Sequence, residues 1–215
     1  MNKRLLVTRP NFDRTTRYVS VWAKDVIKVA EQKGFTVLDL VGKRANRREF
    51  EGMVRKHKPS FLFLNGHGSA DAITGQNEEP LVEVGVNADV LKGAVTYALS
   101  CSSGKTLGVQ AVAHGADAYI GYREEFIFLF DEAMRTRPGQ DELAAHFSTS
   151  SNQVALSLLK GHTAKEAHEN SRQSFARSMR KLLTSEATDR ESAAIRYLFW
   201  NMRHQVCLGN GSAKI

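Results

Sequence analysis

The sequence is poor in cysteine, in proline and in long apolar runs. Only 2 of its 215 residues are cysteine and 4 are proline. These numbers exclude the disulfide-dense, collagenous and disordered classes of protein. No uninterrupted apolar segment approaches the roughly 20 residues that a membrane helix needs, so membrane insertion is not expected. With 42% hydrophobic residues, the chain has enough apolar surface to build a hydrophobic core.

The short apolar stretch at the N-terminus and the low cysteine content indicate in which cellular compartment the protein resides. The apolar stretch near the N-terminus ends at Thr8, which is too short for the hydrophobic part of a secretory signal. Cys101 and Cys207 are so sparse that we expect two free thiols in a reducing environment. The sequence therefore predicts a cytoplasmic protein.

The net charge of +7 is unevenly distributed along the chain. Residues 1–60 have a net charge of +9, residues 61–140 of −5 and residues 141–215 of +3. A basic chain can bind nucleic acid, but these charges lie in helix-like segments with little aromatic interleaving. Solvent-exposed helix faces explain them better, and nucleic-acid binding stays a lesser alternative.

Hydrophobic periodicity predicts an alternation of strands and helices over the first 122 residues. The expected strands are 4–7, 35–41, 60–64, 94–99 and 116–122, and the helices between them are 14–33, 47–58 and 107–114. A short arm is expected at 81–86, four helices at 140–147, 153–160, 164–183 and 187–203, and a late strand at 206–208. This rhythm predicts one α/β domain over 1–215, with a mainly parallel sheet and a C-terminal helical layer.

Two strand ends carry chemically capable side chains. The strand at 60–64 runs into Asn65-Gly66-His67-Gly68, and the strand at 94–99 runs into Ser100-Cys101-Ser102-Ser103-Gly104. In open parallel sheets, ligands bind beyond the carboxyl ends of the strands. If these two strands are neighbours, His67 and Cys101 project from one edge of the sheet.

A histidine and a cysteine at one edge can perform acyl transfer. An imidazolium lowers the pKa of a nearby thiol, and the thiolate attacks a carbonyl carbon. The amides of Gly68 and Cys101 can hold the resulting oxyanion. The helix expected after Gly104 would further favour the thiolate of Cys101. Alone, His67 fits a structural loop residue and Cys101 a small core residue, so their joint placement is the informative feature.

These motifs resemble the caspase-fold cysteine peptidases of clan CD, which include caspases, metacaspases, gingipains, separase and the bacterial CHAT domains. The stretch Leu64-Asn65-Gly66-His67-Gly68 is similar to the metacaspase Ser-Gly-His-Gly motif, and residues 100–104 match Ser-Cys-x-Ser-Gly. Residues 111–121 are similar to the helix-Gly-Ala-strand passage of CHAT and gingipain-like domains. The likeness covers roughly residues 61–122.

The resemblance implies a three-layer caspase-like sandwich and a cysteine endopeptidase. It makes His67 the general base and acid, Cys101 the nucleophile that forms a thioester, and the Gly68 and Cys101 amides the oxyanion hole. It requires no third side chain, no cofactor and no metal, because a backbone carbonyl commonly orients the histidine. The expected partners are a protein or peptide substrate and an activating or regulatory protein. Control by such a partner or by cleavage would act on residues 66–80 or 123–140.

The residue preference at the cleaved bond stays open. Metacaspases have Asp before the Ser-Cys pair, where this chain has Leu99, and the Gln-Ala-Cys-x-Gly motif of caspases is absent. Substitute acids that could bind a basic substrate side chain are Glu124, Glu125, Asp131 and Asp71. Solvated loop acids are the simpler interpretation, and Arg123 allows the opposite preference, for an acidic side chain.

Two alternatives to a peptidase remain. One is a catalytically silent caspase-like domain that serves as a scaffold or binding module, and the other is the nucleic-acid-binding α/β protein. The histidines form no His-x-x-x-His pair, and no Gly-x-Ser-x-Gly or phosphate-binding glycine loop is present. Metal, serine and nucleotide chemistry are therefore not expected.

Overall fold

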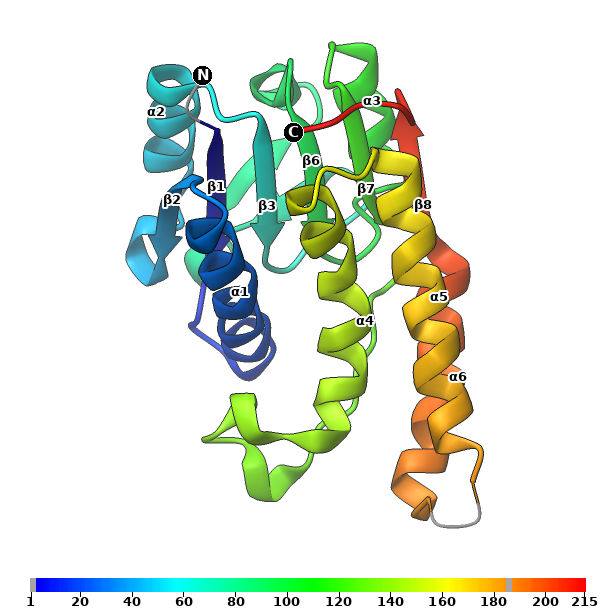
Figure 1. Cartoon of the computed structure of the whole chain (residues 1–215). Helices are drawn as coiled ribbons and strands as arrows, with labels where there is room; N and C mark the ends of the chain where they lie inside the picture. Colours follow the sequence, from blue (N-terminus) through cyan, green and yellow to red (C-terminus); the bar gives the residue numbers. More distant parts are fainter. Residues whose placement is uncertain (1–2, 185–186) are drawn as a thin grey trace.

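One six-stranded sheet forms the centre of the computed structural model, which describes residues 3–184 and 187–215 (Figure 1). Its strands lie in the order β2 (Thr36–Val41), β1 (Arg4–Arg9), β3 (Phe61–Asn65), β6 (Val95–Leu99), β7 (Ala118–Tyr122) and β8 (Gln205–Gly209). The first five strands are parallel, and β8 pairs antiparallel with β7. The prediction of a mainly parallel sheet is confirmed.

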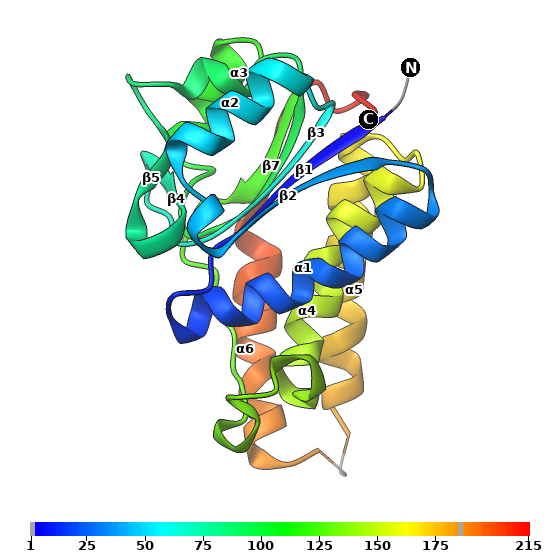
Figure 2. The same ribbon diagram turned by 90° about the vertical axis from the view of Figure 1, so that its left-hand side faces the viewer.

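Helices cover both faces of the sheet, as Figure 2 shows. One face carries α1 (Arg14–Gln32), α4 (Glu142–Leu159) and α5 (Ala164–Leu182), and the other carries α2 (Arg47–His57) and α3 (Leu107–Ala113). The remaining helix, α6 (Asp189–His204), packs against α5 and leads directly into β8. The three-layer arrangement with a C-terminal helical layer is as predicted. Among the described residues, no helix is long and apolar enough to cross a membrane.

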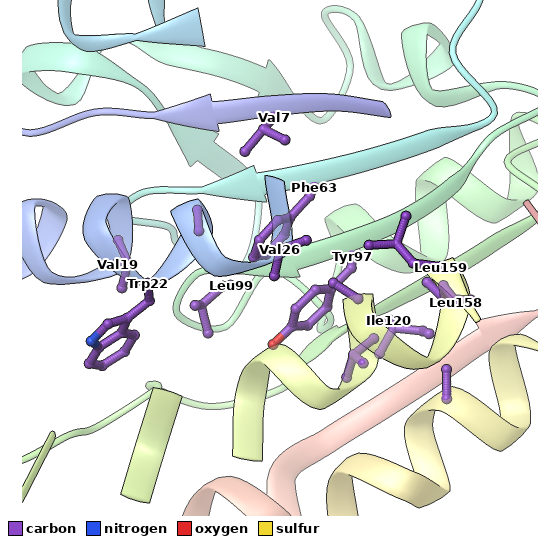
Figure 3. Close-up of a cluster of buried hydrophobic side chains, with 14 of the residues drawn as sticks. Val7, Val19, Trp22, Val26, Phe63, Tyr97, Leu99, Ile120, Leu158 and Leu159 are labelled. Atoms are coloured by element: carbon purple, nitrogen blue, oxygen red, sulfur yellow. The ribbon is translucent and has the colours of Figure 1, made fainter. Parts of the chain in front are cut away.

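The fully apolar strands explain these layers, because successive side chains of a strand point to opposite faces. In β3, Phe61 and Phe63 contact the core under α1, α4 and α5, whereas Leu62 and Leu64 contact the core under α2 and α3. Figure 3 shows Phe63 and Tyr97 in the first core together with side chains of α1 and α4. A strand buried on both faces belongs in the middle of a parallel sheet.

Two expectations on local structure need correction. The two helices expected over 140–160 are one helix, α4 (Glu142–Leu159), and the polar loop after His67 contains a hairpin of β4 (Ala72–Thr74) and β5 (Pro80–Glu83). The serine-rich middle of α4 favours a helix break when considered alone. In the structure, Ser150 Oγ donates to the His146 carbonyl (2.9 Å), and Asn152 Nδ2 donates to the Trp22 carbonyl (2.9 Å). These contacts give the Ser150 hydroxyl and the amide nitrogen of Asn152 hydrogen-bond acceptors inside a continuous helix.

Candidate active site

The His67 and Cys101 loops leave neighbouring strands of the sheet. β3 and β6 are hydrogen-bonded parallel partners, and their last residues, Asn65 and Leu99, lie opposite each other. His67 and Cys101 each follow two residues later, so the chain delivers both to one edge of the sheet. The order of strands in the sequence does not show which strands are neighbours in the sheet. The hydrogen-bonded pairing of β3 with β6 shows that these two are.

Two glycines allow the His67 loop to pack between its neighbours. A Cβ atom on Gly66 would lie 2.1 Å from the carbonyl oxygen of Thr74. A Cβ atom on Gly68 would lie 2.7 Å from the Cys101 carbonyl oxygen and 2.9 Å from Ser100 Cβ. Real Cβ contacts are not this short, so both positions need glycine. The Gly68 backbone therefore lies directly against the backbone of the Cys101 loop.

The His67 ring is held by a carboxylate from the start of α1. His67 Nε2 lies 2.5 Å from Asp13 Oδ2, and the ring contacts Phe12 edge to face with centroids 5.9 Å apart. A carboxylate at Nε2 keeps the proton on that nitrogen in the neutral ring, which leaves Nδ1 as the acceptor. Within the described residues, Nδ1 of His67 makes no hydrogen bond. The ring is thus oriented by one nitrogen and free to accept a proton at the other.

Asp13 also caps the N-terminus of α1. Its Oδ1 accepts from the Thr16 amide and from the Thr16 hydroxyl, both at 2.7 Å. Burial raises the pKa of Asp13, but the hydrogen bonds from Thr16 and His67 outweigh it and hold the pKa below its usual value. The carboxylate therefore stays ionised beside the ring, and the fixed α1 terminus fixes its position.

The Cys101 thiol is covered by the chain that follows β7. Its Sγ lies 3.9 Å from the Phe126 carbonyl oxygen, and within the described residues it makes no hydrogen bond to His67. Burial raises the pKa of Cys101, the Phe126 carbonyl partly offsets that effect, and the charge of Glu125 adds to it. The sequence led us to expect a lowered pKa. That expectation is wrong for this conformation, because α3 starts only at Leu107 and the thiol lies under Phe126.

The covering segment, residues 123–140, is anchored at several points. Phe128 packs against Tyr18 and Trp22 of α1, with ring centroids 5.5 and 4.8 Å away. The Ile127 backbone exchanges two hydrogen bonds with the side-chain amide of Asn201, at 3.0 and 2.7 Å. The start of this segment thus lies against the partly buried Cys101 thiol.

The Gly68 and Cys101 amides belong to the two loops that follow β3 and β6. The Gly68–Ile73 bridge is made by Ser69 N–H to Ala72 O (2.9 Å) and Thr74 N–H to His67 O (2.9 Å). This pattern turns the Gly68 amide away from β4. Within residues 3–184 and 187–215, neither the Gly68 nor the Cys101 amide donates a hydrogen bond. Both donors are available for an external acceptor.

A tight turn follows Cys101. Ser102 has a φ of 55°, a left-handed conformation that is uncommon outside glycine and often marks functional sites. Its amide donates to the Glu124 carbonyl (3.0 Å), and the buried Ser100 and Ser103 hydroxyls lie 2.8 Å apart. The turn is thereby fixed to the strand end of β7.

The four predicted substrate-binding acids are dispersed. Glu124 and Glu125 flank the Cys101 loop, and Glu124 lies 3.8 Å from Lys105 Nζ. Asp131 caps a short turn and lies 3.4 Å from Arg190 Nη1, while Asp71 is exposed beside the β4 hairpin. The structure therefore brings two of the four to the Cys101 loop and gives Asp131 a structural contact elsewhere.

Asp13 is the site residue that sequence reasoning missed. The stretch Asp13-Arg14-Thr15-Thr16 before an apolar-periodic segment is the pattern of a helix N-cap, so a structural role was readable. Its proximity to His67, which is 54 positions away, depends on β1 and β3 being neighbours. The available signal was that Asp13 follows the end of β1 by four residues, because parallel strands β1 and β3 end at the same sheet edge.

Comparison with solved structures identifies the fold. The Arg-specific cysteine proteinase gingipain R matches with a TM-score of 0.63 and 10% identity over 99% of this chain and 47% of its own. The complex of the pro- and mature domains of gingipain R from Porphyromonas gingivalis gives 0.62 and 10% over 99% and 48%. An inactive zymogen C11 protease from Parabacteroides distasonis gives 0.42 and 11% over 96% and 83%.

No family profile and no curated protein matches the chain. The chain spans about half the length of the gingipain R chains it matches. At 10% identity the likeness concerns the fold. The chain therefore has the caspase-like α/β fold found in gingipain R, a clan CD cysteine proteinase.

Proposed function

We propose that residues 1–215 form one peptidase domain, a cysteine endopeptidase that hydrolyses peptide bonds of a protein target. Cys101 is the nucleophile, His67 the general base and acid, and the Gly68 and Cys101 amides the oxyanion hole. Asp13 orients the His67 ring and stabilises its protonated form. Both cysteines are free thiols, which fits a reducing compartment such as the cytoplasm.

The main support is the packing of the His67 loop on the Cys101 loop. Adjacent strands deliver both residues, and the absence of a side chain at Gly68 lets the two backbones touch. The Gly68 and Cys101 amides have no acceptor among the described residues, so both can donate to a tetrahedral oxyanion in this proposal. A base, a nucleophile and two donors at one sheet edge are the parts that acyl transfer requires.

The chemistry proceeds in two steps. His67 Nδ1 takes the thiol proton as Sγ attacks the carbonyl carbon, and the imidazolium then gives this proton to the leaving amine as the C–N bond breaks. The remaining acyl group is a thioester on Cys101. Water attacks the thioester with His67 again as base, and the thiol is restored on release of the carboxylic acid. Asp13 stabilises the positive ring in both steps.

Catalysis in this scheme requires the covering segment to move. The Phe126 carbonyl occupies the space at Sγ, and burial keeps the thiol protonated. A substrate, an activating protein partner or a cut in residues 123–140 would expose Cys101 and let His67 approach it. Glu124 and Glu125, which border the loop, are the proposed contacts for a basic substrate side chain, with Asp131 and Asp71 as more distant ones.

Covalent labelling tests this function. A peptide acyloxymethyl ketone should modify wild-type protein at Cys101, as read by intact mass and peptide mapping. Cys101→Ala should abolish labelling, His67→Ala should slow it at least tenfold, and Cys207→Ala should label like wild type. A library of peptides should then yield cleavage products that the Cys101→Ala protein does not form. Equal labelling of the Cys101→Ala protein, or wild-type products that persist in it, would refute the proposal.

A second candidate is a caspase-like binding module without catalysis. The observation that favours it is the separation of the two groups: Cys101 contacts Phe126, and His67 contacts Asp13. If this state is permanent, no peptide electrophile labels Cys101 even after limited proteolysis within residues 123–140. Partner binding would then be equal in wild type and Cys101→Ala, and iodoacetamide would still reach the thiol in denaturant.

A further inference from the structure

A cationic cavity lies beside the Cys101 loop and has no part in the chemistry described above. It has a volume of about 430 Å³ and is lined by Arg123, Arg172, Arg203 and His204, together with three apolar side chains. We call it the arginine pocket. Among the residues that the structure describes, no aspartate or glutamate lines it.

The charges of the arginine pocket are largely uncompensated. Among the described residues, the guanidinium groups of Arg123 and Arg203 have no ion pair or hydrogen bond. Arg172 lies 3.8 Å from Glu169, in an exposed pair that contributes little. The planar guanidinium group carries donors spaced for two carboxylate oxygens. Three such groups around one cavity form a site for anionic side chains.

The pocket is coupled to the Cys101 loop through short contacts. The Arg123 amide donates to the His204 carbonyl (2.9 Å), and the next residue, Glu124, accepts from Ser102 N–H (3.0 Å). On the other side, a Cβ atom on Gly104 would lie 2.8 Å from Cγ2 of Val206, which lines the pocket. The pocket therefore lies at the edge of the sheet where β7 ends, next to the turn that carries Cys101.

Two exposed aromatic side chains of α6 lie at the pocket, Phe199 in its lining and Trp200 against the ring of His204. Phe199, which also lines the cavity, is 50% exposed, and the neighbouring Trp200 is 37% exposed. The preceding residue, Leu198, is fully buried, so the exposed Phe199 lies on the outer side of α6. Exposed aromatic side chains beside arginines are typical of peptide-binding surfaces.

We propose that the arginine pocket binds an acidic segment of the substrate protein, with Asp or Glu side chains on the arginines and an apolar side chain on Phe199. The proposal rests on the peptidase function and specifies its substrate class as proteins cut beside an acidic segment. Polypeptide carboxylates fit better than a nucleic-acid duplex, because the arginines surround one small cavity. Duplex binding uses an extended basic surface that neutralises many phosphates.

Binding is tested in the full chain carrying Cys101→Ala, so that no cleavage is needed. The probe is a fluorescein-labelled peptide, Leu-Glu-Asp-Glu-Phe-Gly, and its control has Gln and Asn at the acidic positions. Fluorescence anisotropy should show binding of the acidic peptide that weakens between 50 and 200 mM salt, with at least tenfold weaker binding of the neutral peptide. Arg123→Gln with Arg203→Gln should weaken the acidic peptide at least tenfold.

The matched control is Arg48→Gln on α2, an exposed arginine on the opposite layer of the sandwich. This variant should bind the acidic peptide within twofold of its parent, and circular dichroism melting should show that all variants fold. Equal binding of the acidic and neutral peptides, or an unchanged affinity in the double arginine variant, overturns the proposal. A third outcome also overturns it: the acidic peptide fails to bind, whereas a 20-base-pair duplex binds the parent protein and not the double arginine variant.

A second readout separates this proposal from the peptidase function. If Cys101 labels with the ketone but the double arginine variant cleaves acidic peptides as well as the wild type does, the pocket proposal fails and the peptidase stands. If no labelling occurs but the acidic peptide binds through Arg123 and Arg203, the peptidase fails and the pocket remains a peptide site. With both intact, the double arginine variant should lower kcat/KM for acidic peptides at least tenfold and leave ketone labelling within twofold.

Discussion

The carboxylate of Asp13 lies 2.5 Å from the His67 imidazole and at the same time caps the helix that starts at the next residue. The residue therefore links the start of α1 to the loop after β3. A helix terminus is a rigid support, so the direction of the His67 ring depends on the fold and not on the loop alone. This relationship makes Asp13 a positioning residue for the proposed reaction.

Asp13→Asn should lower kcat/KM for peptide cleavage by about tenfold to a hundredfold, because an uncharged amide stabilises the His67 imidazolium less well. Asparagine is as good an N-cap as aspartate, so α1 should remain intact. The measurement is peptide hydrolysis from pH 5 to 9 together with a thermal melt. Asp13→Ala serves as comparison, since it also removes the cap and should cost about 1 kcal/mol of stability. Full activity of Asp13→Asn at every pH would contradict the role.

The lowered pKa of Asp13 makes a separate prediction about stability and pH. A carboxyl group with a depressed folded-state pKa stabilises the fold above its unfolded pKa, about 3.9, and loses that effect as pH falls through the folded value. The free energy of unfolding of wild type should therefore exceed that of Asp13→Asn at pH 7, and the difference should shrink near pH 3. Urea unfolding at both pH values measures it. A difference that grows on acidification would show that the sign is wrong.

Gly68→Ala should destabilise the protein by about 1–3 kcal/mol, because its Cβ would lie 2.7 Å from the Cys101 carbonyl oxygen. The displaced loops should also lose labelling of Cys101 by the peptide ketone. Gly52 in α2 is the matched control, since a Cβ there has nothing within 4 Å. Gly52→Ala should raise the free energy of unfolding by about 1 kcal/mol. Equal melting temperatures for the two variants would contradict the close approach of the two loops.

Glu125→Gln should make the Cys101 thiol more reactive at neutral pH. Burial is the larger cause of its raised pKa, and the negative charge of Glu125 adds to it. Removing that charge lowers the pKa, so alkylation by iodoacetamide at pH 7 should accelerate by roughly twofold. The background is Cys207→Ala, which leaves one thiol. Trp200 donates to the backbone of Glu125, so this anchor is kept. Slower alkylation would contradict the inference that the Glu125 charge raises the pKa of Cys101.

The covering segment should depend on the buried carboxylate of Asp141. Its oxygens accept from the Tyr18 hydroxyl (2.7 Å), the Asp131 amide (2.8 Å) and the Ala144 amide (2.9 Å). Asp141→Ala should cost about 3 kcal/mol and raise the alkylation rate of Cys101 in native buffer, because the segment above the thiol is released. Tyr18→Phe should cost about 1–2 kcal/mol.

The control for that anchor is the exposed ion pair between Arg14 and Glu132, at 2.7 Å. Glu132→Gln removes a contact of the same segment but should change stability by less than about 1 kcal/mol. If it raises the Cys101 alkylation rate as much as Asp141→Ala does, the buried hydrogen bonds are not what holds the segment.

The alternation of apolar strands and amphipathic helices in the sequence was enough to predict the fold class. Phe61–Leu64 and Leu5–Val7 are continuous apolar runs, which only a sheet buried on both faces accommodates. The same local pattern placed His67 and Cys101 at strand ends. Local propensity wrongly predicted a helix break in the serine-rich centre of α4. There Ser150 hydrogen-bonds Ser178 and Asn152 hydrogen-bonds Trp22, and both partners are distant in the sequence.

Residue order alone thus determined most of the strands and helices, though not the β4 hairpin or the continuity of α4, and it placed His67 and Cys101 after β3 and β6. Only the tertiary structure decided that Asp13 meets the His67 ring, that Phe126 lies over the Cys101 thiol and that three arginines surround one cavity. The reason is that hydrophobic periodicity is a property of neighbouring residues. Contacts between residues 25 to 80 positions apart depend on strand order and on how the layers pack.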